Sequence, residues 1–204
     1  MKKLLNPRGY LSWTQIDLWL RKPDTYVERY MFGGEDVRTN RMDFGSKAAT
    51  ALENGEETDD ELLNMLVALL PKYPKREYEI RVPFKTKGGT VDLLGKLDQF
   101  RPKPLAFRET KTGVVKWTEG RAKKHRQLDH YTALIWLKHG KIPDEIYLDW
   151  AETRDDDGIV SLTGKVETFP IKKTMTDVLS YLALVSRVAA EIDARYRKEL
   201  AKIS

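Results

Sequence analysis

The feature that most constrains the fold is a change of periodicity at Pro74. Before it, apolar residues recur every three or four positions, as on amphipathic helices. Three strand-like runs follow it, separated by Lys87-Gly88-Gly89 and by the prolines of 101–104. They span 77–84, 90–100 and 105–111. Short turns between consecutive strands predict an antiparallel meander.

Helices are expected on either side of the meander in the chain, with one further strand pair. The expected helices begin at Ser12, Asp24 and Phe44, after a cap at Thr58, at Glu119 (ending at Lys138) and at Met175. The further strands are 145–153 and 164–169, and a turn at 155–158 joins them. We therefore expect one domain over 1–204, with a helical part (1–74) and a sheet core with flanking helices (75–204). The fold class is mixed α/β (α+β), a central mixed sheet flanked by helices.

The composition excludes several classes of protein. Hydrophobic residues make up 41% of the chain and charged residues 33%, which is typical of a folded, water-soluble domain. The absence of cysteine excludes disulfides, thiolate zinc sites and iron–sulfur clusters. No apolar run approaches the ~20 residues of a membrane span, and the first residues lack a secretory signal, so we expect no membrane association and a cytoplasmic location, in the nucleoid or in a virus-infected cell.

Basic residues are concentrated in one segment. Residues 101–126 contain nine Lys or Arg and two Glu, a local charge of +7 in a chain whose net charge is +5. Such a segment suits a polyanion, although a solvated helix face is the commoner reason for a run of charge. The residues expected to contact phosphates are Lys116, Arg121, Lys123, Lys124 and Arg126.

Two carboxylates are expected to meet where the second and third runs face each other. In a hairpin symmetric about residues 103 and 104, Asp98 lies directly opposite Glu109. Facing like charges destabilise a sheet unless a cation neutralises them, and hard oxygen ligands suit Mg²⁺ or Mn²⁺. Lys111 shares the face of Glu109, because side chains alternate along a strand.

A hard metal ion, two carboxylates and a lysine can together hydrolyse a phosphodiester. The metal activates water and polarises the phosphate, and the lysine stabilises developing negative charge. Taken alone, Glu109-x-Lys111 is more often an exposed ion pair.

Several motifs together resemble a known family, the RecB-like branch of the PD-(D/E)XK nucleases. Gly95-Lys96-Leu97-Asp98 and Glu109-Thr110-Lys111-Thr112-Gly113 resemble its metal-binding core. Three helical motifs appear in family order: Leu11 to Tyr30, with Ser12, Pro23 and Arg29-Tyr30; Phe44-Gly45 to Leu52-Glu53; and Gln127-x-x-x-Tyr131.

The resemblance implies a restriction-endonuclease-like core and a role for each matching residue. Asp98, Glu109, Glu53 and the carbonyl of Thr110 would serve the metal, Lys111 would be the catalytic lysine, and Gln127 and Tyr131 would contact the nucleic acid. Glu53 and Gln127 could instead be solvent-exposed, and Tyr131 a packing residue. Ala49 stands where the branch has a metal-ligating histidine, and Lys22 where cluster-bearing members have cysteine, so no iron–sulfur cluster is expected.

The sequence therefore predicts a Mg²⁺- or Mn²⁺-dependent deoxyribonuclease, an exonuclease or end-processing enzyme of recombination, repair or phage-type replication. It lacks a phosphate-binding loop for ATP, so it would act alone or with a helicase, recombinase or other replication protein. The alternatives are a non-catalytic DNA-binding or assembly module, an RNA-directed phosphodiesterase, and a basic scaffold whose carboxylates are ordinary surface residues.

Overall fold

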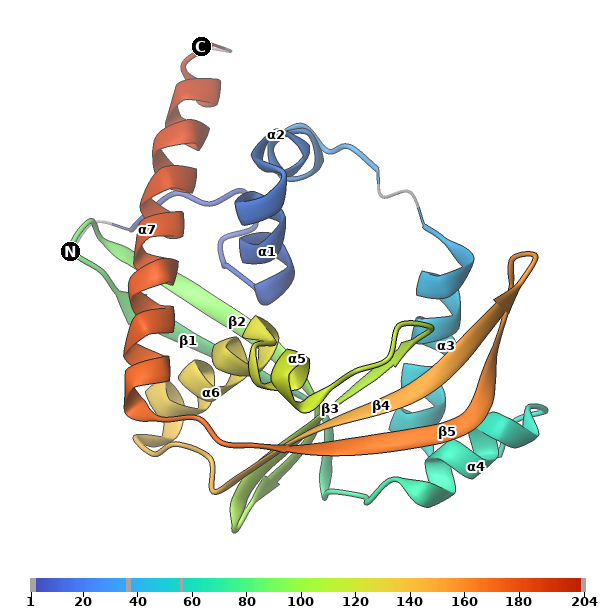
Figure 1. Cartoon of the computed structure of the whole chain (residues 1–204). Helices are drawn as coiled ribbons and strands as arrows, with labels where there is room; N and C mark the ends of the chain where they lie inside the picture. The colour runs from blue at the N-terminus through green and yellow to red at the C-terminus, as the bar shows by residue number, and fades with distance from the viewer. Residues whose placement is uncertain (1–2, 36–37, 56, 203–204) are drawn as a thin grey trace.

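The computed structural model describes residues 3–35, 38–55 and 57–202, which form a five-stranded mixed sheet flanked by helices (Figure 1). The predicted mixed α/β class is confirmed. In chain order the elements are α1 (Trp13–Arg21), α2 (Pro23–Tyr26), the π-helical turn η1 (Val27–Met31), α3 (Asn40–Asn54), α4 (Glu61–Leu69), β1 (Lys75–Lys85), β2 (Thr90–Pro102), β3 (Leu105–Gly113), α5 (Glu119–Lys123), α6 (Arg126–His139), β4 (Glu145–Asp156), β5 (Ile159–Ile171) and α7 (Met175–Leu200).

The strands lie in the sheet in the order of the chain, β1-β2-β3-β4-β5. The pairs β1–β2 and β2–β3 are antiparallel, as the meander predicted. β3 and β4 are parallel, so the chain must cross from one end of the sheet to the other between them, and α5 and α6 make this crossover. β5 returns antiparallel to β4.

The pairing of β2 with β3 is short. It runs from Gln99 opposite Arg108 to Pro102 opposite Leu105, in the register expected from the sequence. Asp98 and Glu109 are the first residues beyond the last pair, and from there the two strands part. We call this opening between β2 and β3 the fork.

Two hydrophobic clusters lie on either side of the fork. The larger joins β1, β2 and β3 to helices α1, α6 and α7, and Phe107 meets Tyr131 of α6 edge-on with ring centroids 5.9 Å apart. The smaller joins α3 and α4 to β4 and β5 through residues such as Phe44, Leu66 and Leu162. The site described below lies where the two clusters meet.

The part of β2 that has left β3 receives other hydrogen-bond partners. The amides of Leu4 and Leu11 donate to the carbonyls of Thr90 and Asp92 at 2.9 and 2.8 Å. From α6, Nε2 of His130 lies 2.9 Å from the Leu94 carbonyl, and the Tyr131 hydroxyl donates to the Lys96 carbonyl at 2.7 Å. Buried backbone groups need such partners, so the N-terminal segment and α6 replace the missing strand.

Gly95 allows α6 to approach this edge of β2. A Cβ atom at Gly95 would lie 2.5 Å from a methyl group of Leu134 and 2.9 Å from the ring of Tyr131. Any larger residue would force Leu134 and Tyr131 to shift, and Tyr131 makes one of the hydrogen bonds that flank Gly95. The glycine of the Gly95-Lys96-Leu97-Asp98 motif is therefore a packing requirement.

Several local expectations are wrong. α2 begins at Pro23 rather than at Asp24, α3 begins at Asn40 rather than at Phe44 because Thr39 caps it, and β5 begins at Ile159 rather than at residue 164. The helix expected over 119–138 is divided into α5 and α6, because His125 has an extended backbone and packs edge-on against Trp117, with ring centroids 5.0 Å apart. Asp60, not Thr58, caps α4, and the Thr58 hydroxyl bonds Asn64 at 3.0 Å instead. The last hairpin turns at 157–158 rather than over 155–158, since β4 continues to Asp156.

Within the described parts of the chain, none of the helices combines the length and the apolar character needed to cross a bilayer.

His130 is held in its neutral form inside the fold. Its Nε2 faces a carbonyl, which only accepts, so Nε2 carries the proton and Nδ1 accepts from the Tyr181 hydroxyl at 2.9 Å. The ring is fully buried, and burial lowers the pKa of His130 from 6.5 to about 4. Between about pH 6.5 and 4, His130 is therefore protonated in the unfolded chain but neutral in the folded chain.

We predict that the free energy of unfolding falls as the pH is lowered from 6.5 to 4, with His130 contributing roughly 3 kcal/mol of that fall. His130→Gln should lose this contribution, because it removes the group that titrates. Urea unfolding at both pH values measures the effect. The pKa of the exposed His139 is also lowered, so His139→Gln is the control for a surface histidine and should lose less of the dependence than His130→Gln; an unchanged dependence in His130→Gln would contradict the prediction.

Candidate active site

In the fork, the Asp98 side chain replaces the backbone carbonyl that would otherwise pair with an amide of β3. Its Oδ2 accepts a hydrogen bond from the backbone amide of Thr110 at 2.7 Å, where β3 has no neighbour from β2. The carboxylate of one strand thus binds the backbone of the other and holds the two strands at a defined separation.

Glu109 and Lys111 lie two residues apart on β3 and share a face of the strand. Nζ of Lys111 donates to Oε1 of Glu109 at 2.5 Å. Glu109 is only 1% exposed, and its second oxygen, Oε2, is buried and has no hydrogen-bond partner. The lysine therefore pairs with one oxygen of this carboxylate, and the other has no hydrogen-bond partner, although Gln127 lies near enough to lower the pKa of Glu109.

The buried charges perturb one another. Burial and the charge of Glu109 raise the pKa of Asp98 well above its usual value. Burial also raises the pKa of Glu109, although Lys111 opposes this. Burial disfavours the charged ammonium of Lys111, but the two carboxylates outweigh it and raise the lysine pKa. One lysine does not compensate two buried carboxylates, so the site favours a further cation.

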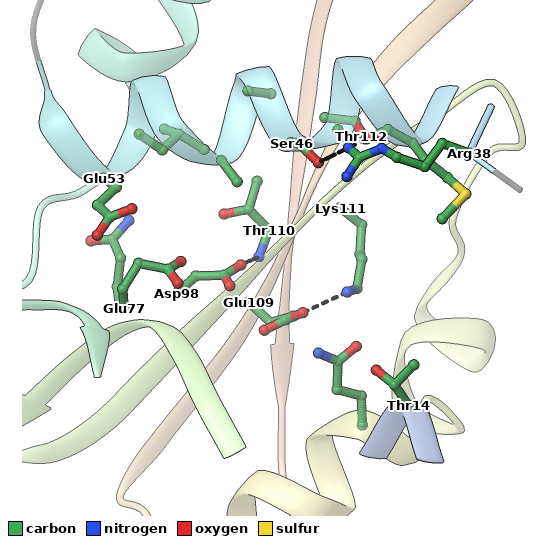
Figure 2. A pocket seen from close by; sticks show the side chains of 17 residues that line it. Thr14, Arg38, Ser46, Glu53, Glu77, Asp98, Glu109, Thr110, Lys111 and Thr112 are labelled. Atoms are coloured by element: carbon green, nitrogen blue, oxygen red, sulfur yellow. Dashed lines mark hydrogen bonds and ion pairs between the residues drawn. The ribbon is translucent and has the colours of Figure 1, made fainter. Parts of the chain in front are cut away.

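These residues open onto a pocket of about 590 Å³ between the fork and α3 (Figure 2). The wall contributed by α3 is built largely from small side chains, Gly45, Ser46, Ala48 and Ala49. Ala49, where a histidine ligand was considered, adds no polar group. Thr14 and Arg38 lie at the end of the pocket next to Lys111, and Glu53 and Glu77 lie at the end next to Asp98.

The structure brings most of the predicted site residues together. Glu53, Asp98, Glu109, Thr110, Lys111 and Gln127 all line this pocket. Glu53 is exposed at the end of α3, whereas Tyr131 is buried behind Gln127, which donates to its hydroxyl at 2.8 Å. Tyr131 therefore supports Gln127 and β2 from behind.

The predicted phosphate-contacting residues Lys116, Arg121, Lys123, Lys124 and Arg126 are exposed and lie outside the pocket lining. They follow β3 in the loop and helix next to the fork. Arg121 already has hydrogen-bond partners within the chain, because its Nη1 donates to the carbonyls of Val115 and Lys116, each at 3.1 Å. Lys116 has a long ion pair with Glu167, at 3.7 Å.

Glu77 was missed by the sequence analysis. It lies on β1 beside Asp98, lines the pocket and forms an ion pair with Lys96 at 2.5 Å. Its backbone has φ of +46°, in the left-handed region that a residue with a side chain seldom adopts, and its charge contributes to the raised pKa of Asp98. Counting across the hairpin that turns at 87–88 would have placed it opposite Asp98.

The donor set is compatible with a hard divalent cation. Among the described residues, no three His, Cys, Asp or Glu side chains are arranged to hold a metal ion. Mg²⁺ needs fewer protein ligands than that, since one or two carboxylates, water and substrate phosphates complete its shell. The unpartnered Oε2 of Glu109 and the raised pKa values of both carboxylates fit such an ion.

Comparison with known proteins identifies the fold. No family model and no curated protein matches the sequence. A phage-related exonuclease from Haemophilus somnus 129PT is similar in structure, with a TM-score of 0.50 and 13% identity over 87% of this chain and 80% of that one. LHK-Exo, solved in complex with dAMP, has a TM-score of 0.49 and 12% identity over 97% and 96%. The likeness to the phage-related exonuclease shows an exonuclease-like mixed α/β fold.

We predict that Asp98→Asn raises the free energy of unfolding by about 1–3 kcal/mol at neutral pH in a buffer with a chelator. The amide removes a charge that burial and two neighbouring glutamates disfavour, while its oxygen still accepts from Thr110. Thermal or urea unfolding measures the change.

Asp156→Asn is the matched control and should change little, because that side chain is 71% exposed. The gain of Asp98→Asn should shrink at acidic pH, where the wild-type carboxyl group is already protonated. A destabilised Asp98→Asn would show that the ionised group is needed for the fold.

Proposed function

We propose that this protein is a Mg²⁺- or Mn²⁺-dependent nuclease that hydrolyses phosphodiester bonds of DNA. The observation that carries the proposal is the group of buried Glu109 and half-buried Asp98 and Lys111, all of which line one pocket at the fork. The fold shared with a phage-related exonuclease supports it, and so does the excess of basic residues beside the fork.

Each residue has a chemical task in the proposed reaction. Asp98, Glu109 and the carbonyl of Thr110 would hold the ion, with Glu53 and Glu77 adding negative charge at one end of the pocket. When bound, the ion would polarise the phosphate and lower the pKa of a water molecule. Lys111 keeps its proton, so its ammonium group can stabilise charge that develops on the phosphate oxygens.

The fork suits a nucleic acid strand because it combines this charged floor with a second, polar wall. The Gln127 amide is fixed by Tyr131 and lines the same pocket, where it can donate to or accept from a nucleotide. We further propose that the substrate is a DNA end, which is supported by the fold shared with a phage-related exonuclease, and that the protein serves recombination, repair or phage-type replication, alone or with a helicase or recombinase.

The first prediction concerns cleavage. Wild-type protein should degrade linear DNA in Mg²⁺ or Mn²⁺ and not in EDTA, and Lys111→Ala, Asp98→Ala and Glu109→Ala should each lower the rate at least about 100-fold, since each removes one part of the charge arrangement. End-labelled linear single-stranded DNA, linear duplex, closed circular DNA and RNA are the substrates. Lys103→Ala, in the exposed turn between β2 and β3, is the control and should cleave like wild type.

The outcomes separate the alternatives. Cleavage of linear but not circular DNA indicates an exonuclease, and preference for RNA indicates an RNA-directed enzyme. Binding of DNA without cleavage by the wild type would favour a non-catalytic module. Cleavage retained in Asp98→Ala or Glu109→Ala would exclude the proposed site.

The second prediction concerns binding. Lys123→Glu combined with Lys124→Glu should weaken DNA binding and reduce the slope of log K against log salt by about 1.5, because two fewer phosphates are neutralised. Fluorescence anisotropy over a series of salt concentrations measures the slope. Lys85→Glu with Lys87→Glu makes the same charge change at the exposed β1–β2 turn and should leave the slope unchanged; equal slopes in both variants would remove α5 from the binding surface.

A further inference from the structure

The loop between β3 and α5 presents two apolar side chains to solvent next to the candidate site. Val114 is 43% exposed and Val115 is 67% exposed, and they follow Lys111-Thr112-Gly113 directly. Exposed adjacent valines contribute nothing to either hydrophobic cluster of the fold. Their exposure therefore calls for a reason other than stability.

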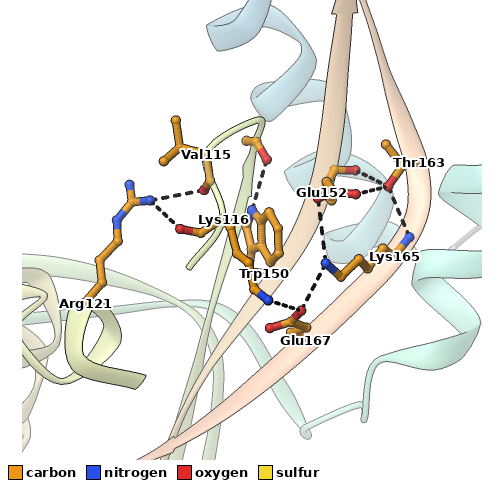
Figure 3. Close-up of polar contacts among 9 residues, drawn as sticks. Val115, Lys116, Arg121, Trp150, Glu152, Thr163, Lys165 and Glu167 are labelled. Carbon is orange, nitrogen blue, oxygen red and sulfur yellow. Dashed lines mark hydrogen bonds and ion pairs between the residues drawn. The ribbon is translucent and has the colours of Figure 1, made fainter. Parts of the chain in front are cut away.

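The loop is held in place by contacts from three elements (Figure 3). The buried indole of Trp150 donates to the Gly113 carbonyl at 3.0 Å, which fixes the start of the loop. Arg121 of α5 donates to the carbonyls of Val115 and Lys116 and covers the ring of Trp117, with its guanidinium carbon 4.2 Å from the ring centroid.

The far side of the loop is tied to β5. Lys116 pairs with Glu167, which also pairs with Lys165 at 3.2 Å, and Lys165 lies over the ring of Trp150 at 5.3 Å. The backbone of the loop is thus anchored while the two valine side chains are free. A prearranged apolar surface of this kind loses little conformational entropy when a ligand binds to it.

A second pocket, of about 250 Å³, lies behind the loop and continues from the first. Lys111 and Thr112 line both pockets, so the two adjoin at this point of β3, and a strand with a phosphate at Lys111 would have the second pocket next to it. Its walls are largely apolar, from Phe44, Val114, Val115, Trp117 and Val160, and its lining includes two cationic residues, Arg121 and Arg41, the latter paired with Asp155 at 2.7 Å.

This combination has the chemistry of a nucleotide: apolar walls for a base and cationic groups for the flanking phosphates. Trp117 itself is 7% exposed and is covered by Arg121, so the valines offer the accessible contact. A base paired within a duplex would not be available to such a surface, whereas an unstacked base would be.

We propose that Val114 and Val115, with the pocket behind them, bind the unpaired base next to the phosphate held at Lys111. The inference rests on the proposed nuclease function and adds to it a preference for a strand whose base is unstacked at that position. Val115 would then be a specificity-determining residue that contacts the base and takes no part in the chemistry.

Binding in EDTA tests the proposal without relying on cleavage. The probes are short single-stranded DNA oligonucleotides, each with one abasic nucleotide, scanned along the sequence. For wild type, we expect the abasic nucleotide to weaken binding about five- to tenfold at one position. Val115→Asp should bind every oligonucleotide with the same affinity, because the base contact is already lost. Val115→Ala should lie between the two.

Leu179→Asp is the matched control. It places the same charge on an exposed apolar residue of α7, 55% exposed and lining a different pocket, and should keep the wild-type pattern. Two results would overturn the inference and leave the nuclease proposal intact. In one, Val115→Asp loses affinity at the same abasic position as wild type. In the other, no abasic position lowers the affinity of wild type. Failure of the wild type to bind any of these oligonucleotides in EDTA would overturn this inference, and the cleavage assay in Mg²⁺ tests the nuclease proposal separately. Normal cleavage beside an unchanged abasic pattern in Val115→Asp would overturn this inference alone.

Discussion

The parting of β2 and β3 is the constraint on which the rest of the structure depends. Two antiparallel strands that paired over their whole length would direct their amides and carbonyls at each other and leave no space between them. Here the pairing stops at Gln99 and Arg108, and the groups released must be satisfied in another way. The N-terminal segment, His130 and Tyr131 do this for β2, and the Asp98 carboxylate does it for β3.

The same opening explains how charged groups come to be buried. A carboxylate and an ammonium group are costly to remove from water, and only close pairing and hydrogen bonds offset that cost. Glu109 obtains this from Lys111, while on β3 the neighbouring Arg108 forms a buried bidentate pair with Asp149 of β4, at 2.8 and 2.6 Å. The Arg108 pair is complete, with Thr168 as a further donor at 2.6 Å. The Glu109 pair leaves one oxygen free, which distinguishes a structural ion pair from a group suited to a ligand.

Two helices, α6 and α3, contribute to the pocket at the fork in different ways. α6 approaches closely because of Gly95, and through Tyr131 it positions Gln127. α3 lines another wall of the pocket and contributes small side chains. Glu77 on β1 adds a carboxylate from a third strand, and its left-handed backbone is a local strain that the fold maintains beside the candidate site.

By itself the sequence determined the types of the elements, the antiparallel meander with its register, and the placing of Glu109 and Lys111 on one face. These follow from periodicity and turn residues, which act over short stretches of chain. Only the tertiary structure decided where β2 and β3 part, that Glu77 joins Asp98, that the helix expected over 119–138 divides at His125, and that Arg121 anchors a loop. Each of these depends on contacts between elements distant in the sequence, whose energies outweigh local preference and leave no periodic signal.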